Sequence, residues 1–260
     1  RAPRTSRRFL FELLILIAVS LSTVVEICSR IVVCGRYLFG VDVMKLYGYK
    51  PCAPCRSVAM CLEYLGAQYT YEVVDITAGD QMKPDYLKIN PQHTVPSLDD
   101  QGFYLHESRA ILRYLANQHG ADRGLYPTDP KERAQVDMML CFDMGTLYQR
   151  FGDYVYPTMF REVPMDAEKR QKFVEGIIYL EMYLGERQFT CGDHITIADF
   201  AILSTVSTFK ACGYDLSDHP NVESWVERCS SLIPNYQSAN QSGAELFAKW
   251  MKSKTNLKLF

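Results

Sequence analysis

A turn at residues 50–57, Lys-Pro-Cys-Ala-Pro-Cys-Arg-Ser, links a short apolar strand to a helix and limits the folds open to this chain. Pro54 suits a first helical turn, because its fixed φ is helical and it has no N–H to leave unpaired. Cys52 is therefore expected just outside the helix N-terminus. Unpaired N–H groups and the helix dipole lower the pKa of a thiol there from about 8.5 to between about 3.5 and 7.5. The turn suits thiolate chemistry.

The segments around this turn alternate between strand and helix patterns. Residues 44–49 predict a strand, 56–65 a helix and 69–74 a second strand, which together form a βαβ unit. A short helical turn ending at Ile89 and two further short strands, at residues 97–98 and 103–105, precede a helix at 108–119. Two strands after a βαβ unit predict a mixed sheet, so the first domain is expected over residues 44–120.

Beyond a linker at residues 121–130, which is rich in Gly, Asp and Pro, the patterns are helical. This predicts an all-α helical bundle domain over residues 131–254. One helix start is explicit, because Thr196 can cap the N–H of Asp199 while Asp199 bonds back to Thr196. The fold class is thus α/β, βαβ-ββα, followed by an all-α domain.

Residues 1–43 differ from the rest of the chain. They hold six arginines against three acidic residues, and 9–25 form a nearly continuous apolar run. A membrane-spanning helix needs about 20 apolar residues, so the run is marginal as an anchor. Three interpretations stay open: a membrane anchor, a cleaved presequence, or a gene-model artefact absent from the mature protein. A membrane partner is expected only if the extension is real.

Composition excludes several classes of function. The 260 residues are 48% hydrophobic and carry a formal charge of −2, which argues against a nucleic-acid partner. The nine cysteines are odd in number and scattered, which favours free thiols in a reduced intracellular setting. One Cys-x-x-Cys without a second pair is weak evidence for zinc, so no metal site is predicted.

Four motifs carry a family resemblance that extends over nearly all of residues 44–252. The stretches 44–57, 87–96, 107–111 and 142–148 resemble the insect delta class of glutathione transferases, in register. The resemblance implies a thioredoxin-like first domain, a homodimer, a cytoplasmic location, and glutathione as co-substrate. The implied activity is conjugation of glutathione to hydrophobic electrophiles, a detoxification reaction.

The resemblance also implies a glutathione site. Its residues are Cys52, His93, Thr94, Val95, Glu107, Ser108 and Arg109. The helix start at Ser108 can hold the γ-glutamyl carboxylate while Glu107 takes the amine, although an ordinary helix cap explains the same residues. Val95, before a cis proline in this family, pairs with the cysteinyl unit, and His93 contacts the glycyl carboxylate. Gln81 stands where delta enzymes often have a second histidine.

Cys52 departs from the delta pattern, which has a serine whose hydroxyl stabilises the glutathione thiolate. A thiol is a poor donor, and a Cys52 thiolate would repel a glutathione thiolate. It would instead attack a glutathione disulfide, as in omega-like transferases and glutaredoxins, with Cys55 either resolving the product or serving only as a buried helix residue. Cys52 is nevertheless the predicted catalytic residue.

The second-substrate pocket is expected among the aromatic side chains of residues 148–160. Tyr148, Tyr156 and Phe160 are assigned to it, because a segment interrupted by Gly152 and Pro157 suits a cleft wall better than a sealed core. Two alternatives to conjugation stay open. One is a thiol transferase or reductase that uses Cys52, and the other is a non-catalytic carrier of hydrophobic ligands.

Overall fold

The structure is a computed structural model that describes residues 43–255. The expectations for the extension at residues 1–43 lie, apart from Val43, outside the described residues. Within residues 43–255, no helix combines the length and the apolar character that a membrane span needs. The expected boundaries of the domains and the linker stay predictions.

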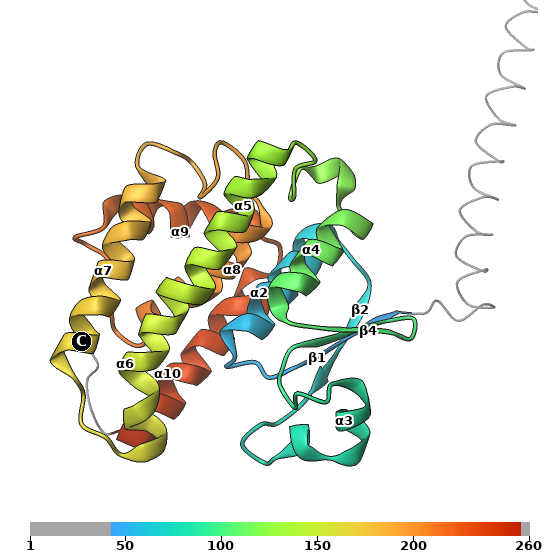
Figure 1. The fold of residues 1–260 in the computed structure, drawn as a ribbon, viewed down its shortest axis with the longest axis horizontal. Helices are drawn as coiled ribbons and strands as arrows, with labels where there is room; N and C mark the ends of the chain where they lie inside the picture. Colours follow the sequence, from blue (N-terminus) through green and yellow to red (C-terminus); the bar gives the residue numbers. More distant parts are fainter. Residues whose placement is uncertain (1–42, 256–260) are drawn as a thin grey trace, which may run out of the picture. The chain divides into compact units, whose positions relative to one another are not determined.

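A four-stranded mixed sheet forms the centre of the first domain (Figure 1). Its strands lie in the order β2-β1-β3-β4 and comprise β1 Met44–Gly48, β2 Tyr69–Val73, β3 Ser97–Asp100 and β4 Phe103–His106. β1 is parallel to β2 and antiparallel to β3, and β3 is antiparallel to β4. Leu46 in β1 pairs with Leu98 in β3, and both are fully buried. The predicted mixed sheet is confirmed.

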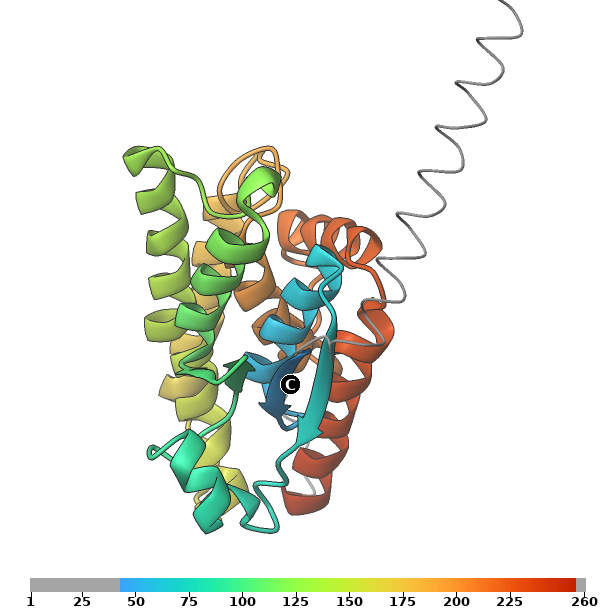
Figure 2. The same cartoon turned by 90° about the vertical axis from the view of Figure 1, so that its right-hand side faces the viewer.

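Helices cover the sheet. Helices α2 (Ala53–Leu65) and α4 (Ser108–His119) pack against each other between the strands and the C-terminal helices (Figures 1 and 2). The short helix α3 (Pro84–Ile89) contacts β1 through the rings of Tyr86 and Tyr47, 6.2 Å apart. Neighbouring strand residues point to opposite faces, so α3 lies on the face away from Leu46.

Helix α2 begins three residues earlier than the apolar pattern predicts. Cys52 is its N-cap in an extended conformation, Pro54 lies in the first turn, and Gly66 ends the helix with a left-handed φ of 65°. Proline is tolerated in a first turn, so it does not delay the helix. The N-terminal position expected for Cys52 is therefore confirmed.

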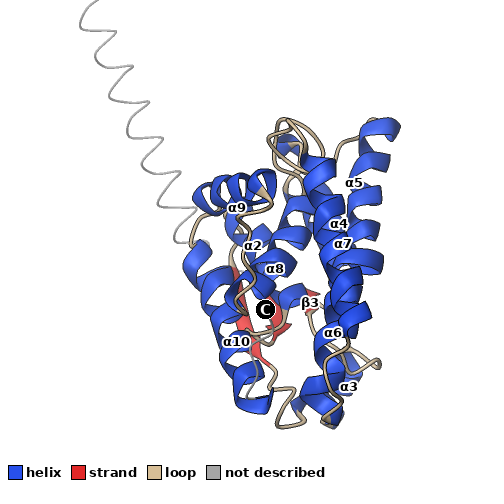
Figure 3. Cartoon of the chain, turned by 90° about the vertical axis from the view of Figure 1, so that its left-hand side faces the viewer, coloured by secondary structure: helices blue, strands red, loops and turns tan. Residues whose placement is uncertain are grey.

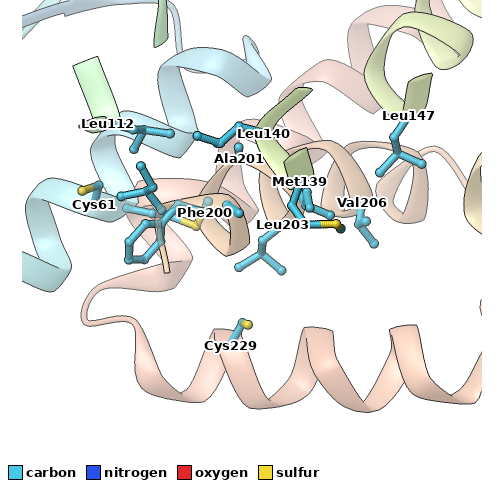
Figure 4. Close-up of a cluster of buried hydrophobic side chains, with 14 of the residues drawn as sticks. Cys61, Leu112, Met139, Leu140, Leu147, Phe200, Ala201, Leu203, Val206 and Cys229 are labelled. Atoms are coloured by element: carbon cyan, nitrogen blue, oxygen red, sulfur yellow. The ribbon is translucent and has the colours of Figure 1, made fainter. Parts of the chain in front are cut away.

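The second part of the chain is helical, as predicted (Figure 3). Its α-helices are α5 Pro130–Phe142, α6 Tyr148–Arg161, α7 Ala167–Leu184, α8 Ile197–Ala211, α9 Pro220–Leu232 and α10 Ser242–Thr255. Two π-helical segments, Asp143–Leu147 and Gln237–Gln241, lead into α6 and α10. Helix α8 is almost wholly buried and contacts α2, α5, α9 and α10. Figure 4 shows Phe200 and Leu203 of α8 among Leu112 and Leu140 from neighbouring helices.

Helix α6 differs from the interrupted segment that its sequence indicates. It runs without a break through Gly152 and Pro157. Proline removes the N–H that would bond to the carbonyl four residues earlier, at Asp153. Asp153 is exposed, so that carbonyl lies on the solvent side of the helix, where water can replace the missing donor.

The predicted start of α8 is confirmed. Thr196 is the N-cap, and it forms reciprocal hydrogen bonds with Asp199 in a capping box. The Asp199 carboxylate also accepts from the Thr190 N–H and from Trp225 Nε1, both at 2.9 Å. One buried acid thus joins the start of α8 to α9 and to the loop before α8.

Candidate active site

Cys52 is held by the backbone of its turn. Its N–H donates to the Tyr49 carbonyl at 2.9 Å, and its own carbonyl accepts from the N–H groups of Cys55 and Arg56, both at 3.1 Å. Cys52 as a residue is half-buried, and its Sγ atom lies 3.9 Å from the Val95 carbonyl oxygen. The turn therefore presents the sulfur at the helix N-terminus, next to the loop that leads to β3.

The surroundings of Cys52 favour its thiolate. A hydrogen bond from the Cys55 side chain lowers the pKa of Cys52 most, with further help from the Cys55 N–H and from the charges of Arg56 and Arg109. These effects outweigh burial, which raises it. Burial and the neighbouring Cys52 raise the pKa of Cys55 well above its ordinary value. Cys55 is fully buried, so Cys52 is the reactive member of the pair.

Arg56 is the buried charge behind the turn. It is only 2% exposed, and its guanidinium donates to Ser207 Oγ at 3.2 Å, to the Ser204 carbonyl at 3.1 Å, and to Thr208 and Asn240. Burial lowers the pKa of Arg56 to about 10, so it keeps its charge at neutral pH. No role for Arg56 was predicted, although its position directly after the Cys-x-x-Cys was an available signal.

The loop before β3 contains a cis peptide bond between Val95 and Pro96, as the resemblance implies. Two buried residues, Tyr86 and Asn90, hold the loop by hydrogen bonds to its backbone. The Tyr86 hydroxyl donates to the Thr94 carbonyl at 2.6 Å, and Asn90 Nδ2 donates to the same oxygen at 2.9 Å. Neither Tyr86 nor Asn90 was assigned to the site from the sequence, although Asn90 belongs to the 87–96 motif.

The remaining loop residues lie further out. His93 and Thr94 are exposed, and the φ of His93 is 49°, in the left-handed region. Gln81, in place of the second histidine, uses its Nε2 to donate to the Ile76 carbonyl at 3.3 Å. Within residues 43–255, no group of three His, Cys, Asp or Glu side chains is placed to hold a metal ion.

The start of α4 leaves its backbone donors available. Glu107 precedes the helix with a φ of 70°, which is strained for a residue other than glycine, and its side chain caps no N–H group. Ser108 is buried, and its Oγ accepts from Arg109 at 3.1 Å. The alternative of an ordinary capping side chain is thus absent from α4, and its first turn can accept an anion.

Arg109 connects this helix start to the second domain. It forms an ion pair with Asp143, which is fully buried and also accepts from the Thr205 hydroxyl at 2.8 Å. Burial raises the pKa of Asp143, against the opposing charge of Arg109. The Arg109 guanidinium also lies over the Tyr148 ring, 5.9 Å from its centroid. Asp143 and Thr205 were not predicted for the site, although Asp143, an acid that continues the apolar stripe of α5 into the following π-helical segment, was a usable signal.

A pocket of about 240 Å³ opens beside Cys52. It brings together Cys52 and the three aromatic residues assigned to the second-substrate site, Tyr148, Tyr156 and Phe160. The remaining side chains of its wall, not predicted for the site, are Tyr49, Pro51, Ala53, Ile76, Thr208, Phe247 and Trp250. A sulfur with a lowered pKa thus faces a mainly apolar hollow between the two domains.

Comparisons with known proteins agree with this arrangement. The family model described as glutathione S-transferase, N-terminal domain, matches residues 46–123, and the C-terminal domain model matches residues 149–228. Glutathione S-transferase D7 of Anopheles gambiae is 40% identical over 211 residues, covering 80% of this chain and 97% of that protein.

Two solved structures are similar along the same part of the chain. A delta-class glutathione transferase of Nilaparvata lugens is 43% identical with a TM-score of 0.79, covering 82% of this chain and all of that one. A glutathione transferase homologue of Drosophila mojavensis, solved with bound glutathione, is 31% identical with a TM-score of 0.76, covering 82% of this chain and 97% of that one.

Proposed function

Because this chain belongs to the glutathione S-transferase family, we propose that its pocket joins reduced glutathione to hydrophobic electrophiles, with Cys52 at the sulfur end. The observation that carries this proposal is the position of Cys52, which lies at the N-terminus of α2 and also lines the apolar pocket that contains Tyr148, Tyr156 and Phe160. The comparisons favour conjugation over the reductase and carrier alternatives.

Glutathione binding would use the donors along the mouth of this pocket. The uncapped start of α4, with Ser108 and Arg109, would hold the γ-glutamyl carboxylate, and the Glu107 carboxylate would take the amine. The backbone of Val95, 3.9 Å from the Cys52 sulfur, would pair with the cysteinyl unit. His93 and Thr94, at the exposed side of the loop, would meet the glycyl end.

The role of Cys52 follows from its charge. As a thiolate it donates no hydrogen bond to the glutathione sulfur, and two thiolates repel each other at short distance. The N–H groups at the start of α2 and the charges of Arg56 and Arg109 would then stabilise the glutathione thiolate. We therefore expect Cys52 to slow conjugation relative to a serine, without abolishing it.

Two further properties are proposed for the whole protein. Exposed apolar side chains on β4, on α5 and just beyond α5 suit a homodimer: Phe103, Tyr104, Met138 and Met144. A cytoplasmic location is proposed because reduced glutathione and free thiols both belong to a reducing compartment.

The test is conjugation by the purified protein. The full chain is incubated with reduced glutathione and a panel of small aromatic electrophiles, and thioether formation is followed against the uncatalysed rate. Saturable thioether formation supports the proposal. A protein that binds glutathione but accelerates no member of the panel would instead be a carrier, and one that exchanges only glutathione disulfides would be a reductase.

A further inference from the structure

Two neighbouring rows of residues run along one face of helix α6, each with a spacing of four residues. The first row is Tyr148, Gly152, Tyr156 and Phe160, and the second row is Gln149, Asp153, Pro157 and Arg161. Residues four apart are neighbours on a helix surface, so each row is continuous and the two rows lie next to each other. The aromatic side chains of the first row line the apolar pocket beside Cys52, whereas the second row is mainly polar.

A second hollow, of about 430 Å³, lies over these rows. Its wall contains both rows of α6 and Lys169 of α7, the helix that packs against α6 (Figure 1). It shares Tyr148, Tyr156 and Phe160 with the apolar pocket beside Cys52. The two hollows therefore adjoin along the aromatic row, one of them apolar and the other lined by charged side chains.

The second hollow contains two cations that are free to meet a ligand. Arg161 is exposed and Lys169 is half-buried, and among the described residues, 43–255, neither side chain forms a hydrogen bond or an ion pair. Arg161 ends α6 and Lys169 lies in the first turn of α7, which follows after the loop at residues 162–166. The acid in this wall is Asp153, whose Oδ1 accepts from Gln149 Nε2 at 2.8 Å. Asp153 lies eight residues before Arg161, about 12 Å along the helix axis, so the positive charge is concentrated at the end of α6.

The two ends of the aromatic row have different neighbours. The Arg109 guanidinium of the proposed glutathione site lies over the Tyr148 ring, 5.9 Å from its centroid. Phe160, at the other end, contacts Trp250 at 5.5 Å between ring centroids and is 59% exposed, so it forms the rim of the apolar pocket. An electrophile with its reacting carbon at the glutathione end would therefore direct a long tail past Phe160, toward Arg161.

We propose that Arg161 and Lys169 bind an anionic group at the end of an apolar tail, so that this protein favours elongated electrophiles with a terminal carboxylate. This inference rests on the proposed conjugating function. Both cations attract a carboxylate, and the planar guanidinium of arginine can bind both of its oxygens. Asp153 repels a carboxylate that stops short of them, so the preference should grow with tail length. The tail binds away from the reacting carbon, so the gain should appear in KM rather than in kcat.

The test uses 4-chloro-3-nitrobenzamides whose amide nitrogen carries a tail of three, seven or eleven methylene groups. Each tail ends either in a carboxylate or in a neutral primary amide. The glutathione sulfur forms a bond to the ring carbon, the C–Cl bond breaks, and chloride takes the electron pair, so nothing is oxidised or reduced. The measured quantity is the acid preference, defined as the ratio of kcat/KM for the acid to that for the amide of equal length. In the unmodified full chain we expect the acid preference to rise from the shortest tail to the longest.

The variant Arg161→Met/Lys169→Met removes both charges and keeps two long apolar side chains. We expect it to lower the acid preference for the longest tail by about 5-fold, which is within the range for two partly exposed charge pairs. Each single substitution should give a smaller loss. Lys172→Met is the matched control on α7, because Lys172 Nζ pairs with Glu168 at 2.7 Å and Lys172 is not part of the wall, so the acid preference should stay unchanged.

Two results would overturn the inference. One is an acid preference that does not depend on tail length, and the other is an acid preference that the double variant keeps. In both cases conjugation of the neutral amides would show that the proposed function stands. If the unmodified protein conjugates none of these compounds, neither acid nor amide, the proposed function fails for them and this inference fails with it.

Discussion

The resemblance to delta enzymes implies a serine at the position of Cys52, and this expected difference sets the direction of a test. Replacing Cys52 with serine supplies a hydroxyl donor and removes a competing thiolate. We expect Cys52→Ser to raise the rate of conjugation of a small aromatic electrophile by about 10-fold or more. Losing one preorganised donor costs about 10²- to 10³-fold in rate, which sets the upper limit of this gain. The variant should also lose any disulfide with glutathione at this position, measured by mass spectrometry after treatment with oxidised glutathione.

Cys52→Ala separates the two contributions, because alanine removes the thiolate but supplies no donor. A gain in serine that alanine does not share assigns the effect to the hydroxyl. If serine destroyed conjugation, the Cys52 thiol itself would be the activator, and the account of serine as the better donor would be wrong.

The lowered pKa of Cys52 predicts how its alkylation depends on pH. Only the thiolate reacts with iodoacetamide, so the rate rises as the pH passes upward through the pKa of Cys52. Because that pKa is lowered, the rise should come at lower pH than for N-acetylcysteine measured in parallel. Cys55, buried and with a raised pKa, should stay unmodified in the folded protein. Coincident curves for Cys52 and N-acetylcysteine would show that the turn leaves the thiol unperturbed.

Individual site residues could be predicted from the sequence where a short local pattern, such as a turn or a helix start, identifies them. Cys52 follows from a proline turn before a helix, and Ser108 follows from a helix start. The roles of Asp143 and Thr205 could not be found this way, even though Asp143 stands out as an acid among apolar residues, because these roles depend on contacts of Asp143 with Arg109 of α4 and with Thr205 of α8. Tertiary contacts of this kind have no local signature.

Among the elements, the start of α8 depends on one buried acid. Asp199→Ala removes the capping partner and leaves the buried donors of Thr190, Thr196 and Trp225 without their acceptor. A lost cap costs about 0.5 to 2 kcal/mol and each unpaired buried donor about 1 to 3 kcal/mol. We expect a loss of about 3 kcal/mol or more in the free energy of unfolding, measured by urea denaturation.

Asp166→Ala is the matched control for that prediction. Asp166 caps α7 through the N–H groups of Glu168 and Lys169, but it is exposed, so water can replace it. Its loss should stay within about 0.5 to 2 kcal/mol. Equal losses in the two variants would mean that the contacts of Asp199 beyond the cap contribute nothing.

The start of a helix was predicted where capping residues and apolar period agree, as in α8. Helix α6 was not, because Gly152 and Pro157 are both typical of interruptions. The structure gives each a place in an unbroken helix. Gly152 makes room for the Tyr156 ring, and Pro157 follows an exposed residue whose carbonyl can bond to water. Packing on α6 therefore overrides local preference.

Across the described part of the chain, α2 is the helix of the first domain that packs most extensively against the second domain. The Arg56 guanidinium donates hydrogen bonds to residues of α8 and to Asn240. Gly243 in α10 lies so close to the cysteine turn that a Cβ atom there would overlap the Lys50 carbonyl oxygen. The pocket beside Cys52 includes Phe247 and Trp250 of α10 for the same reason. The alternation of strands and helices predicted two domains, but it did not predict that the last helix would complete the site.

The homodimer is the property that concerns the whole protein. Phe103 on β4 contacts Tyr114 of α4, at 5.3 Å between ring centroids, and yet stays 50% exposed. Met138 on α5 is 47% exposed, and the Asp137 beside it pairs with Arg113 of α4. These contacts place β4, α4 and α5 side by side, with apolar groups at both ends of the surface. A second copy of the chain would cover them.

We expect the protein to elute and scatter light at micromolar concentration with twice the mass of one chain. Met138→Glu should shift it toward the monomer, because an interface that buries an unpaired carboxylate is destabilised. Leu232→Glu is the matched control, since Leu232 is 48% exposed at the end of α9, away from β4 and α5, and its substitution should leave the dimer intact. A monomer in the unmodified protein would contradict the prediction. Equal dissociation of both variants would show that added charge, rather than this surface, governs assembly.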